Sequence, residues 1–478
     1  MKRLLLVFIA LVAIFALVPP ASAAELKFGG LFAQKVYGTN NQHDGQQNSH
    51  GEYDDNTNWF YTRMRLYFDA VASENLKAVS KFEIDDYWGD GRLGSLSADG
   101  GSNNDSAGME IKNAYIDFLV PDTALNIKMG IIGARLDKPA WVFNDDTSGI
   151  FAAYKYGEWY FAGLYSRLGD SNSISPTGSA ITPTQSSDDV DIWAFAVNYN
   201  IEGVFTALNF AWINNDDNWA NTDDLARPGA TAEPGNSLDL YVFSLDGDYS
   251  SDEFSVYGDV AFNAGKSKQT SPSSDFKGYA FMAGGTFNAT DTITVGADFY
   301  YASGNKLGND DTKAFTTAGA PSGRNAYNMD EVVFPGWFDD DTVTIQAPGG
   351  PPNTTNVTST GLGTNAGYTL NNIWAIGAHA DFKPLEKTLI QFGGAYMGFV
   401  EKVASRTSDG MAPNATLSNV LEDRDSLGGS FYLRASQGIV DGLTLKAAVG
   451  YFFADEGFSP HRKDDDAYRI AGGLFWSW

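Results

Sequence analysis

Hydrophobic and polar residues alternate along many segments of about ten residues, which is the pattern of β-strands with two unlike faces. One face of segment 59–70 carries Phe60, Met64, Leu66, Phe68 and Ala70. The other face carries Trp59, Tyr61, Arg63, Arg65, Tyr67 and Asp69. Such strands suit a soluble sandwich, or a membrane barrel whose apolar face contacts lipid and whose polar face lines the lumen.

The connections between these segments favour the barrel. Tight turns are expected at eight places: 72–75, 120–123, 157–158, 200–203, 250–253, 288–291, 383–386 and 437–442. They alternate with nine long polar stretches, which predicts 18 strands. Short turns on one rim and long loops on the other are typical of transmembrane barrels. We therefore predict an all-β, antiparallel, up-and-down transmembrane β-barrel of 18 strands, with 16 or 20 as alternatives.

The last predicted strand ends on an aromatic residue. One face of segment 467–478 carries Tyr468, Ile470, Leu474, Trp476 and Trp478. This terminus resembles the aromatic-ended assembly signal of Gram-negative outer-membrane barrels. We assign that signal to Ile470, Leu474, Trp476 and Trp478, and the resemblance implies that the barrel-assembly machinery is a partner.

The first residues have the three parts of a secretory signal peptide. Lys2 and Arg3 precede an apolar run over 4–18, and Ala21-Ser22-Ala23 forms an A-x-A cleavage site. The run is shorter than the ~20 residues that a membrane helix needs. We expect cleavage between Ala23 and Ala24, a signal peptide at 1–23, and a single barrel domain at 24–478.

Composition narrows the functional classes. The net charge of −27 argues against nucleic acid as a partner, and the absence of cysteine excludes disulfides and thiolate chemistry. Acidic runs such as Asp339–Asp341 offer oxygen ligands to divalent cations, or bridges to lipopolysaccharide, but none forms a calcium-loop motif. No nucleophile or histidine stands in a catalytic pattern. We expect no enzymatic activity, no bound cofactor and no metal site, with solvated acidic loops as the simplest interpretation.

With its loop rhythm and terminal strand, the chain resembles the Gram-negative porin family, channels of about 16 to 18 strands that commonly form trimers. The resemblance implies an outer-membrane location, contact with lipid and lipopolysaccharide, a homotrimer, and passive diffusion of small hydrophilic solutes through a water-filled lumen. Many porins fold the loop after the fifth strand inward. Here the corresponding stretch is 134–149, and its apolar Trp141-Val142-Phe143 suits packing against the barrel wall. An outer loop packed on its neighbours, or a trimer contact, is the alternative.

Charged residues that point inward by parity are candidates for the pore constriction. Arg63 and Arg65 are the strongest, and Lys77, Arg434, Lys446 and Arg469 are weaker. The predicted constriction set comprises Arg63, Arg65, Lys81, Lys128, Arg135, Asp137, Asp145 and Asp146. We expect the two arginines to face the three aspartates across the narrowest section, giving weak cation selectivity. Inward acids such as Asp69 and Asp259 are as numerous, so scattered, solvated charges are the competing interpretation.

Several functions stay open. A general diffusion porin leads, with a substrate-specific channel for an anion or a sugar as the alternative. An outer-membrane hydrolase and a structural scaffold rank lower. Stretch 303–370 exceeds the ~15 residues of an ordinary loop. It is expected to cap the mouth, plug the lumen, add a hairpin or decorate the surface.

Overall fold

The structure is a computed structural model. It describes residues 24–40, 56–88, 109–169, 190–216, 237–268, 274–304, 313–317, 329–332, 372–403, 424–455 and 466–478. The proposed signal peptide, with Ala21 and Ala23, lies outside these ranges, as does most of stretch 303–370. Ala24 is exposed and directly precedes the first strand. Among the described residues, no helix has the length and apolar character needed to cross a membrane.

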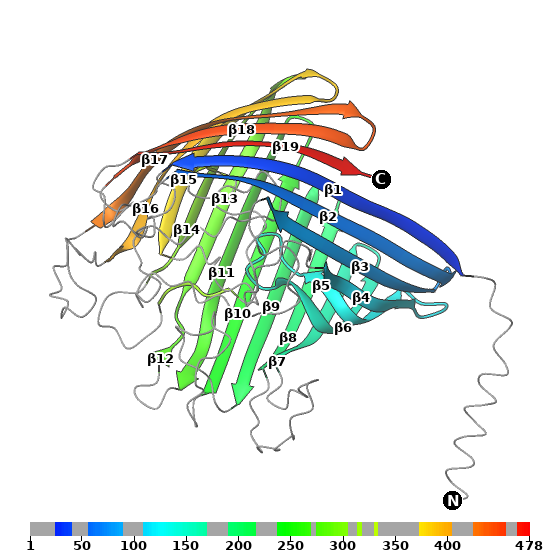
Figure 1. Ribbon diagram of the computed structural model, residues 1–478. Coiled ribbons are helices and arrows are strands. Elements are labelled where there is room, and N and C mark those ends of the chain that lie inside the picture. Colours follow the sequence, from blue (N-terminus) through cyan, green and yellow to red (C-terminus); the bar gives the residue numbers. More distant parts are fainter. Residues whose placement is uncertain are drawn as a thin grey trace, which may run out of the picture.

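Strands account for nearly all of the described chain (Figure 1). They are β1 (Glu25–Asn40), β2 (Asn56–Ser73), β3 (Leu76–Tyr87), β4 (Met109–Leu119), β5 (Leu125–Arg135), β6 (Asn144–Tyr156), β7 (Trp159–Gly169), β8 (Val190–Ile201), β9 (Val204–Asp216), β10 (Ser237–Ser250), β11 (Phe254–Lys268), β12 (Ser274–Asp275), β13 (Tyr279–Thr290), β14 (Ile293–Ala302), β15 (Ile373–Leu385), β16 (Thr388–Val403), β17 (Arg424–Val440), β18 (Leu443–Ala454) and β19 (Ala467–Ser477).

These strands form one closed antiparallel sheet. Each strand pairs with the next along the chain, and β1 closes the barrel against β19 with Phe32 opposite Trp476. The short β12 and the longer β13 both pair with β11, so together they make one crossing. The barrel therefore has 18 spanning strands, as the sequence predicted. Since β14 pairs directly with β15 from Ala302↔Ile373 to Ile293↔Phe382, no further strand lies between these two in the described wall.

The eight predicted tight turns all join sequential strands at one rim. The turn after β2, for example, consists of Glu74 and Asn75, and the turn after β6 of Gly157 and Glu158. Gly157 has a φ of +57°, a left-handed conformation that glycine adopts without steric cost. Glu25 pairs with Val71 beside the first of these turns, so the barrel begins at the short-turn rim.

The outer face of the wall is apolar and open to its surroundings. Large side chains there remain exposed all around the barrel, among them Phe60, Ile116, Met129, Leu208, Leu245, Ile376, Phe392 and Ile470. A soluble protein would bury a continuous band of this kind, whereas lipid accommodates it. The period-two pattern is thus that of a transmembrane β-barrel, and the apolar face points outward as predicted.

The inner face is less uniformly polar than expected. Inward residues of β8 and β10 include Ile192, Ala194, Leu238, Leu240 and Val242, all nearly inaccessible to solvent. They belong to an apolar core that also contains Trp141, Phe315 and Met329 from connecting segments. The barrel therefore holds a hydrophobic core inside its wall, because connecting segments pack against one side of the lumen.

The wall is split between β4 and β5. Their pairing stops at Ala114↔Ile131, although β4 extends outward to Met109 and β5 to Arg135. Beyond the split, β4 pairs only with β3 and β5 only with β6. A β-bulge places Lys112 as an extra residue next to the split, because Lys81 pairs with Asn113 and Phe82 with Ile111.

Candidate pore-lining site

The connection after β5 is shorter than the sequence indicated. The expected loop 134–149 is wrong at both ends, because Ala134 pairs with Asp145 and Gly133 with Asp146 in the β5–β6 ladder. The true connection is 136–143, referred to below as loop 136–143. The polar run Asn144-Asp145-Asp146-Thr147 resembles a loop in sequence but forms the start of β6. Polar residues that face an aqueous lumen need no hydrophobic partner, so a strand can begin with a polar run. Because such a run looks like a loop in the sequence, the start of β6 was predicted too far along the chain.

Loop 136–143 folds into the barrel and reaches distant strands. Lys138 Nζ lies 2.6 Å from Asp248 Oδ2 near the short-turn end of β10, and 3.9 Å from the centre of the Phe205 ring on β9. The Trp141 ring packs edge-on against Tyr300 of β14 and against Phe315. Both β10 and β14 are several strands away from β5 and β6 in the sheet order. A segment that contacts all of them lies within the lumen.

Asp137 holds the loop in shape from within. Its carboxylate accepts hydrogen bonds from the backbone amides of Trp141 (2.7 Å), Val142 (3.0 Å) and Phe143 (3.4 Å). The side chain is buried, and Asp246 of β10 lies nearby, accepting a 3.3 Å bond from the Lys138 amide. Burial, together with the charge of Asp246, raises the pKa of Asp137 to about 7, against the opposing pull of the three amides. Asp137, which the sequence placed in the constriction, is therefore a buried residue that stabilises the conformation of the loop.

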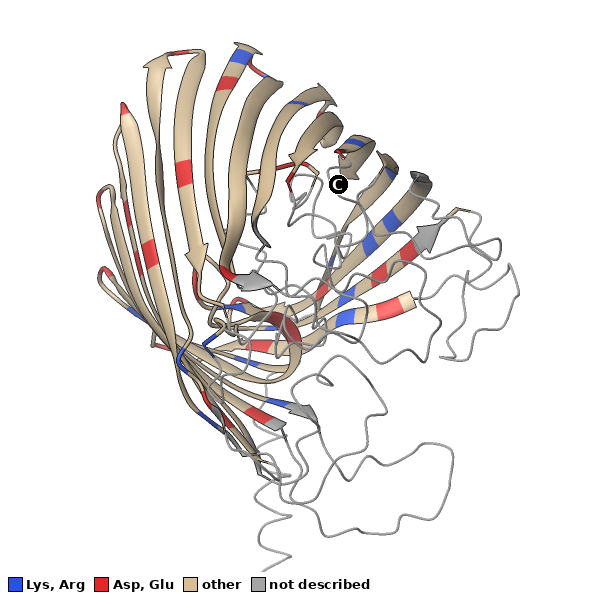
Figure 2. Ribbon diagram, turned by 90° about the vertical axis from the view of Figure 1, so that its left-hand side faces the viewer, with Lys and Arg blue, Asp and Glu red and all other residues tan. Residues whose placement is uncertain are grey.

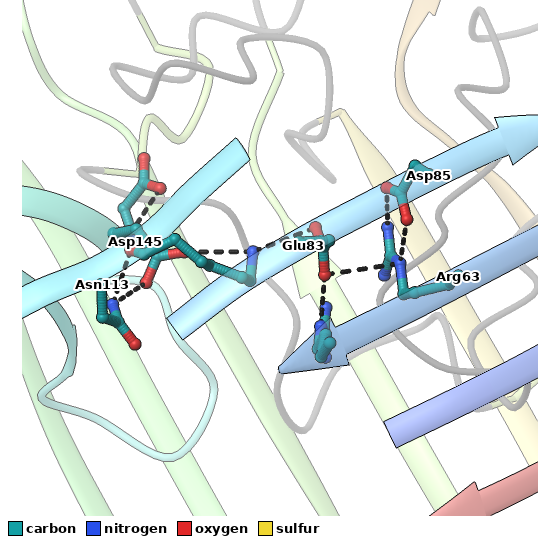
Figure 3. A network of polar contacts seen from close by, with 8 residues as sticks. Arg63, Glu83, Asp85, Asn113 and Asp145 are labelled. Carbon is teal, nitrogen blue, oxygen red and sulfur yellow. Dashed lines mark hydrogen bonds and ion pairs between the residues drawn. The ribbon is translucent and has the colours of Figure 1, made fainter. Parts of the chain in front are cut away.

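A polar network lines the wall from β2 to β6 (Figure 3). Arg63 binds Asp85 through two hydrogen bonds of 2.8 and 2.7 Å and lies 3.4 Å from Glu83. Arg65 also pairs with Glu83. The two predicted arginines are thus brought together at the wall, where their partners are acids of the adjacent strand β3. We call Arg63, Arg65, Glu83, Asp85, Lys112, Asn113 and Asp146 the lumenal network.

The far side of the lumenal network bridges the split in the wall. Lys112 Nζ lies 3.0 Å from Asp146 Oδ2 and 3.5 Å from Glu83 Oε1, while Asn113 Nδ2 donates a 2.9 Å hydrogen bond to Asp146 Oδ1. Sequence reasoning included Asp146 but missed Lys112. Strict alternation cannot place a bulged residue, and Ile111-Lys112-Asn113 carries no glycine or proline that would have indicated the bulge.

The other predicted constriction residues are dispersed. Lys81 and Lys128 lie nearer the short turns, with their ammonium groups over the rings of Tyr67 (5.4 Å) and Tyr115 (5.6 Å). Arg135 ends β5, where its guanidinium donates to the Asp137 and Lys138 carbonyls. Asp145 lies in β6 and accepts a hydrogen bond from the Asp146 amide. These residues therefore belong to different levels of the barrel.

A second buried charge cluster lies on the opposite side of the closure seam. Glu331 pairs with Arg434 of β17 at 2.7 Å and with Arg469 of β19. All three side chains are at most 2% exposed. The two arginines were weaker candidates from the sequence, and nothing in it linked Glu331 to them. The long separation along the chain conceals this contact.

The strands of the barrel carry residues of both signs of charge (Figure 2). Inward-facing bases gather on strands around the closure seam: Lys35, Arg63, Arg65, Arg434 and Arg469. Acids stand on β10, β11, β14 and β15: Asp246, Asp248, Asp259, Asp298 and Asp381. His379 of β15 lies 3.7 Å from Asp298. Within the described ranges, no cluster of three or more metal-ligating side chains occurs.

The terminal strand lies where barrel closure requires it. Gly30 and Trp478 exchange two backbone hydrogen bonds of 3.2 Å, and the Trp478 ring lies 4.6 Å from that of Trp476. Ile470 and Leu474 face outward on the same strand. The predicted assembly residues thus sit on the lipid side of the seam, while their role in assembly stays a prediction.

Comparison with known proteins identifies the fold. No protein-family model matches the chain, and no curated protein does. The outer membrane protein OprD from Pseudomonas aeruginosa is similar in structure, with a TM-score of 0.50, 10% identity and 94% of each chain covered. The chain has the fold of an outer-membrane porin. OccD3 (OpdP) of the same organism gives a TM-score of 0.49 at 9% identity, covering 96% of this chain and 93% of that chain. OmpTdeltaL8, a loop L8 deletion mutant of OmpT, an outer membrane protein of Vibrio cholerae, gives 0.40 at 9% identity, covering 96% and 100%.

Proposed function

We propose that the protein is an outer-membrane channel through which ions and small hydrophilic solutes diffuse passively. Loop 136–143 narrows the lumen from one side, and the lumenal network bounds the remaining passage from the other. The observation that supports this proposal is the contact of Lys138 with Asp248 of β10 and of Trp141 with Tyr300 of β14, two strands remote from β5 and β6 in the sheet. A barrel of about 18 strands is wide enough to keep an aqueous path beside such a loop.

The charge arrangement supports transport of hydrophilic solutes. Charges of both signs on the inner wall, of which Asp85, Lys112 and Asp146 are more exposed than Arg63 and Glu83, replace part of the hydration of an ion or a polar solute as it passes. Because the charges of the lumenal network are paired, the wall has no strong field of one sign, which favours weak selectivity over tight binding. The buried pair Arg434 and Arg469, which binds the carboxylate of Glu331, favours an anion-specific channel as the second candidate.

Reconstitution tests the proposal. Purified, heat-modifiable barrel is inserted into a planar bilayer in potassium chloride, and into liposomes challenged with neutral sugars of increasing size. Stepwise conductance and size-limited swelling are expected. Saturable block by one class of solute would favour the substrate-specific channel. A folded, inserted barrel that gives neither current steps nor swelling would overturn the channel proposal.

Assembly into a homotrimer is a separate proposal, supported by the resemblance to porins and by the broad apolar outer wall. Native mass spectrometry of detergent-solubilised barrel measures the subunit number. A mass of three chains is expected, and a mass of one chain at every protein concentration would contradict the trimer.

A further inference from the structure

Residues 329–332 lie against the inner wall of the barrel. Met329, Asp330, Glu331 and Val332 are all at most 3% exposed, although no strand contains them. Met329 and Val332 belong to the lumenal hydrophobic core. The four residues contact β15, β17, β18 and β19, and we call them the inner segment.

Two arginines of the wall bind the inner segment through its backbone carbonyls and through the Glu331 side chain. Arg434 Nε donates to Glu331 Oε2 at 2.7 Å, and Arg434 Nη2 donates to the Asp330 carbonyl at the same distance. Arg469 Nη1 donates to the Glu331 carboxylate and, at 3.4 Å, to its carbonyl. Arg434 also binds Gln391, and its guanidinium stacks 4.1 Å from the Tyr432 ring. The arginines are thus preorganised to hold a carboxylate.

The wall is shaped to receive the inner segment. A β-carbon at Gly450 of β18 would lie 2.8 Å from Val332 Cγ2 and 3.0 Å from Glu331 Cβ. A β-carbon at Gly377 of β15 would lie 3.2 Å from Met329 Cβ. The two glycines therefore allow the inner segment to lie closer to the strands than any other residue would permit.

We propose that the inner segment is a built-in plug for one side of the lumen, latched by Glu331. The Glu331 carboxylate acts as an internal anion in the site formed by Arg434 and Arg469. While it is bound, the inner segment covers the wall from β15 to β19, and its carboxylate offsets one of the two arginine charges, so solutes pass along the wall from β1 to β6. Glu331 is then a selectivity-determining residue, because its removal exposes an anion-attracting wall.

This inference rests on the proposed channel function, but the position of the latch is testable without any current. The chain has no cysteine, so Met329→Cys with Gly377→Cys introduces the sole pair. The separation of 3.2 Å between the two β-carbon positions is slightly below the usual ~3.5–4.5 Å of a disulfide, a difference that small local movement accommodates. Mild oxidation of the folded barrel is expected to cross-link the pair almost completely, as seen by a reductant-sensitive gel shift.

Matched controls separate proximity from general reactivity. Met329→Cys with Ala153→Cys on β6, a strand remote from β15 in the sheet order, is expected to give no internal cross-link. Equal cross-linking of both pairs, or of neither, would overturn the plug. Because this assay reads only position, it remains decisive even if the barrel conducts no ions.

The latch is then tested by current. Glu331→Gln removes the charge of a buried ion pair, which shifts the ratio of latched to released segment by on the order of a hundredfold. Larger single-channel conductance and a zero-current potential displaced toward anions are expected, with Glu386→Gln in an exposed turn as the matched control. Cross-linking Met329→Cys to Gly377→Cys in the Glu331→Gln background is expected to return the conductance to the wild-type level, and reductant to raise it again.

Normal cross-linking combined with unchanged conductance and selectivity in Glu331→Gln would show that the inner segment is structural packing, and would overturn the latch. Where Glu331→Gln fails to fold, Glu331→Gln with Arg434→Gln removes one of the two arginine charges left without a carboxylate and serves in its place. Conductance that stays at the wild-type level in this double variant would likewise overturn the latch.

Discussion

Lys112 Nζ lies 3.0 Å from the carboxylate of Asp146 at the point where the β4–β5 backbone ladder ends. The pair joins β4 to β6 across a split in the wall, assisted by the hydrogen bond from Asn113. Side chains here replace the backbone hydrogen bonds that a barrel wall normally supplies.

Replacing Lys112 with Met is expected to weaken the barrel at this split. The pair is about one-quarter exposed, so solvent screens it in part, and a loss of roughly 1 kcal/mol is expected. The measurement is the temperature at which heat-modifiable barrel converts to the unfolded band. Lys266→Met, which removes an exposed pair with Asp275 at 3.8 Å, is the control and should leave that temperature unchanged. Equal transition temperatures for wild type and Lys112→Met would show that the bridge does not stabilise the wall.

Arg63→Ala with Arg65→Ala is expected to change ion selectivity. The two arginines pair with Glu83 and Asp85, so their loss leaves Asp85 without its arginine and Glu83 with Lys112 as its cationic partner, which makes the wall beside the passage more negative. The zero-current potential across a salt gradient should move toward stronger cation preference, and less so in high salt, where the Debye length falls to ~3 Å at 1 M. Arg167→Ala, which removes a more exposed arginine of β7, is the control. An unchanged potential would place the arginines away from the ion path.

The raised pKa of Asp137 predicts that the docking of loop 136–143 depends on pH. Its folded pKa of about 7 lies above the ordinary 3.8, so the stability that its protonated form gives to the docked loop is complete at acid pH. That stability is lost progressively as the pH rises from about 4 to about 7. Conductance is therefore expected to rise between about pH 4 and about pH 7, as the loop loosens, and to level off above about pH 7. Asp137→Asn should flatten the profile, whereas Asp122→Asn in an exposed turn should not. A wild-type conductance that is constant over this range would contradict the role of Asp137.

The closure seam is expected to require glycine at position 30. A β-carbon on Gly30 would overlap the Trp478 ring and lie 2.6 Å from the Arg65 carbonyl oxygen. Gly30→Ala and deletion of Trp478 should each reduce the amount of heat-modifiable barrel in the outer membrane. Gly258→Ala is the matched control, because a β-carbon there meets nothing within 4 Å. Wild-type amounts of barrel in both test variants would remove the terminal aromatic from the assembly signal.

The sequence predicted the strands and turns because both are local. Alternation in segment 59–70 and the pairs Gly157-Glu158 and Glu74-Asn75 act over a few residues. It also identified Arg63 and Arg65 as inward residues, because side-chain direction follows parity within a regular strand.

What the sequence could not predict depends on long-range contacts or on departures from regularity. The ends of loop 136–143 are set by pairing of Ala134 with Asp145, and the role of Asp137 by three amides that only the folded loop brings together. The β-bulge at Lys112 breaks the strict alternation of side-chain directions, so alternation could not show which way Lys112 points. Glu331 and Arg434 are far apart in the sequence and come together only in the folded barrel. Arg63 was expected to face acids of the connection after β5, but its partner is Asp85 on the adjacent strand β3.

The central claim is that loop 136–143 narrows a conducting lumen. Lys138→Ala with Trp141→Ala removes two side-chain contacts of the loop with distant strands, at Asp248 and at Tyr300. Single-channel conductance of wild type and variant in a planar bilayer is the most direct test, with insertion checked by heat modifiability. The account predicts discrete steps for wild type and larger, noisier steps for the variant. Steps of the same size for both proteins, or a folded wild-type barrel without steps, would contradict it.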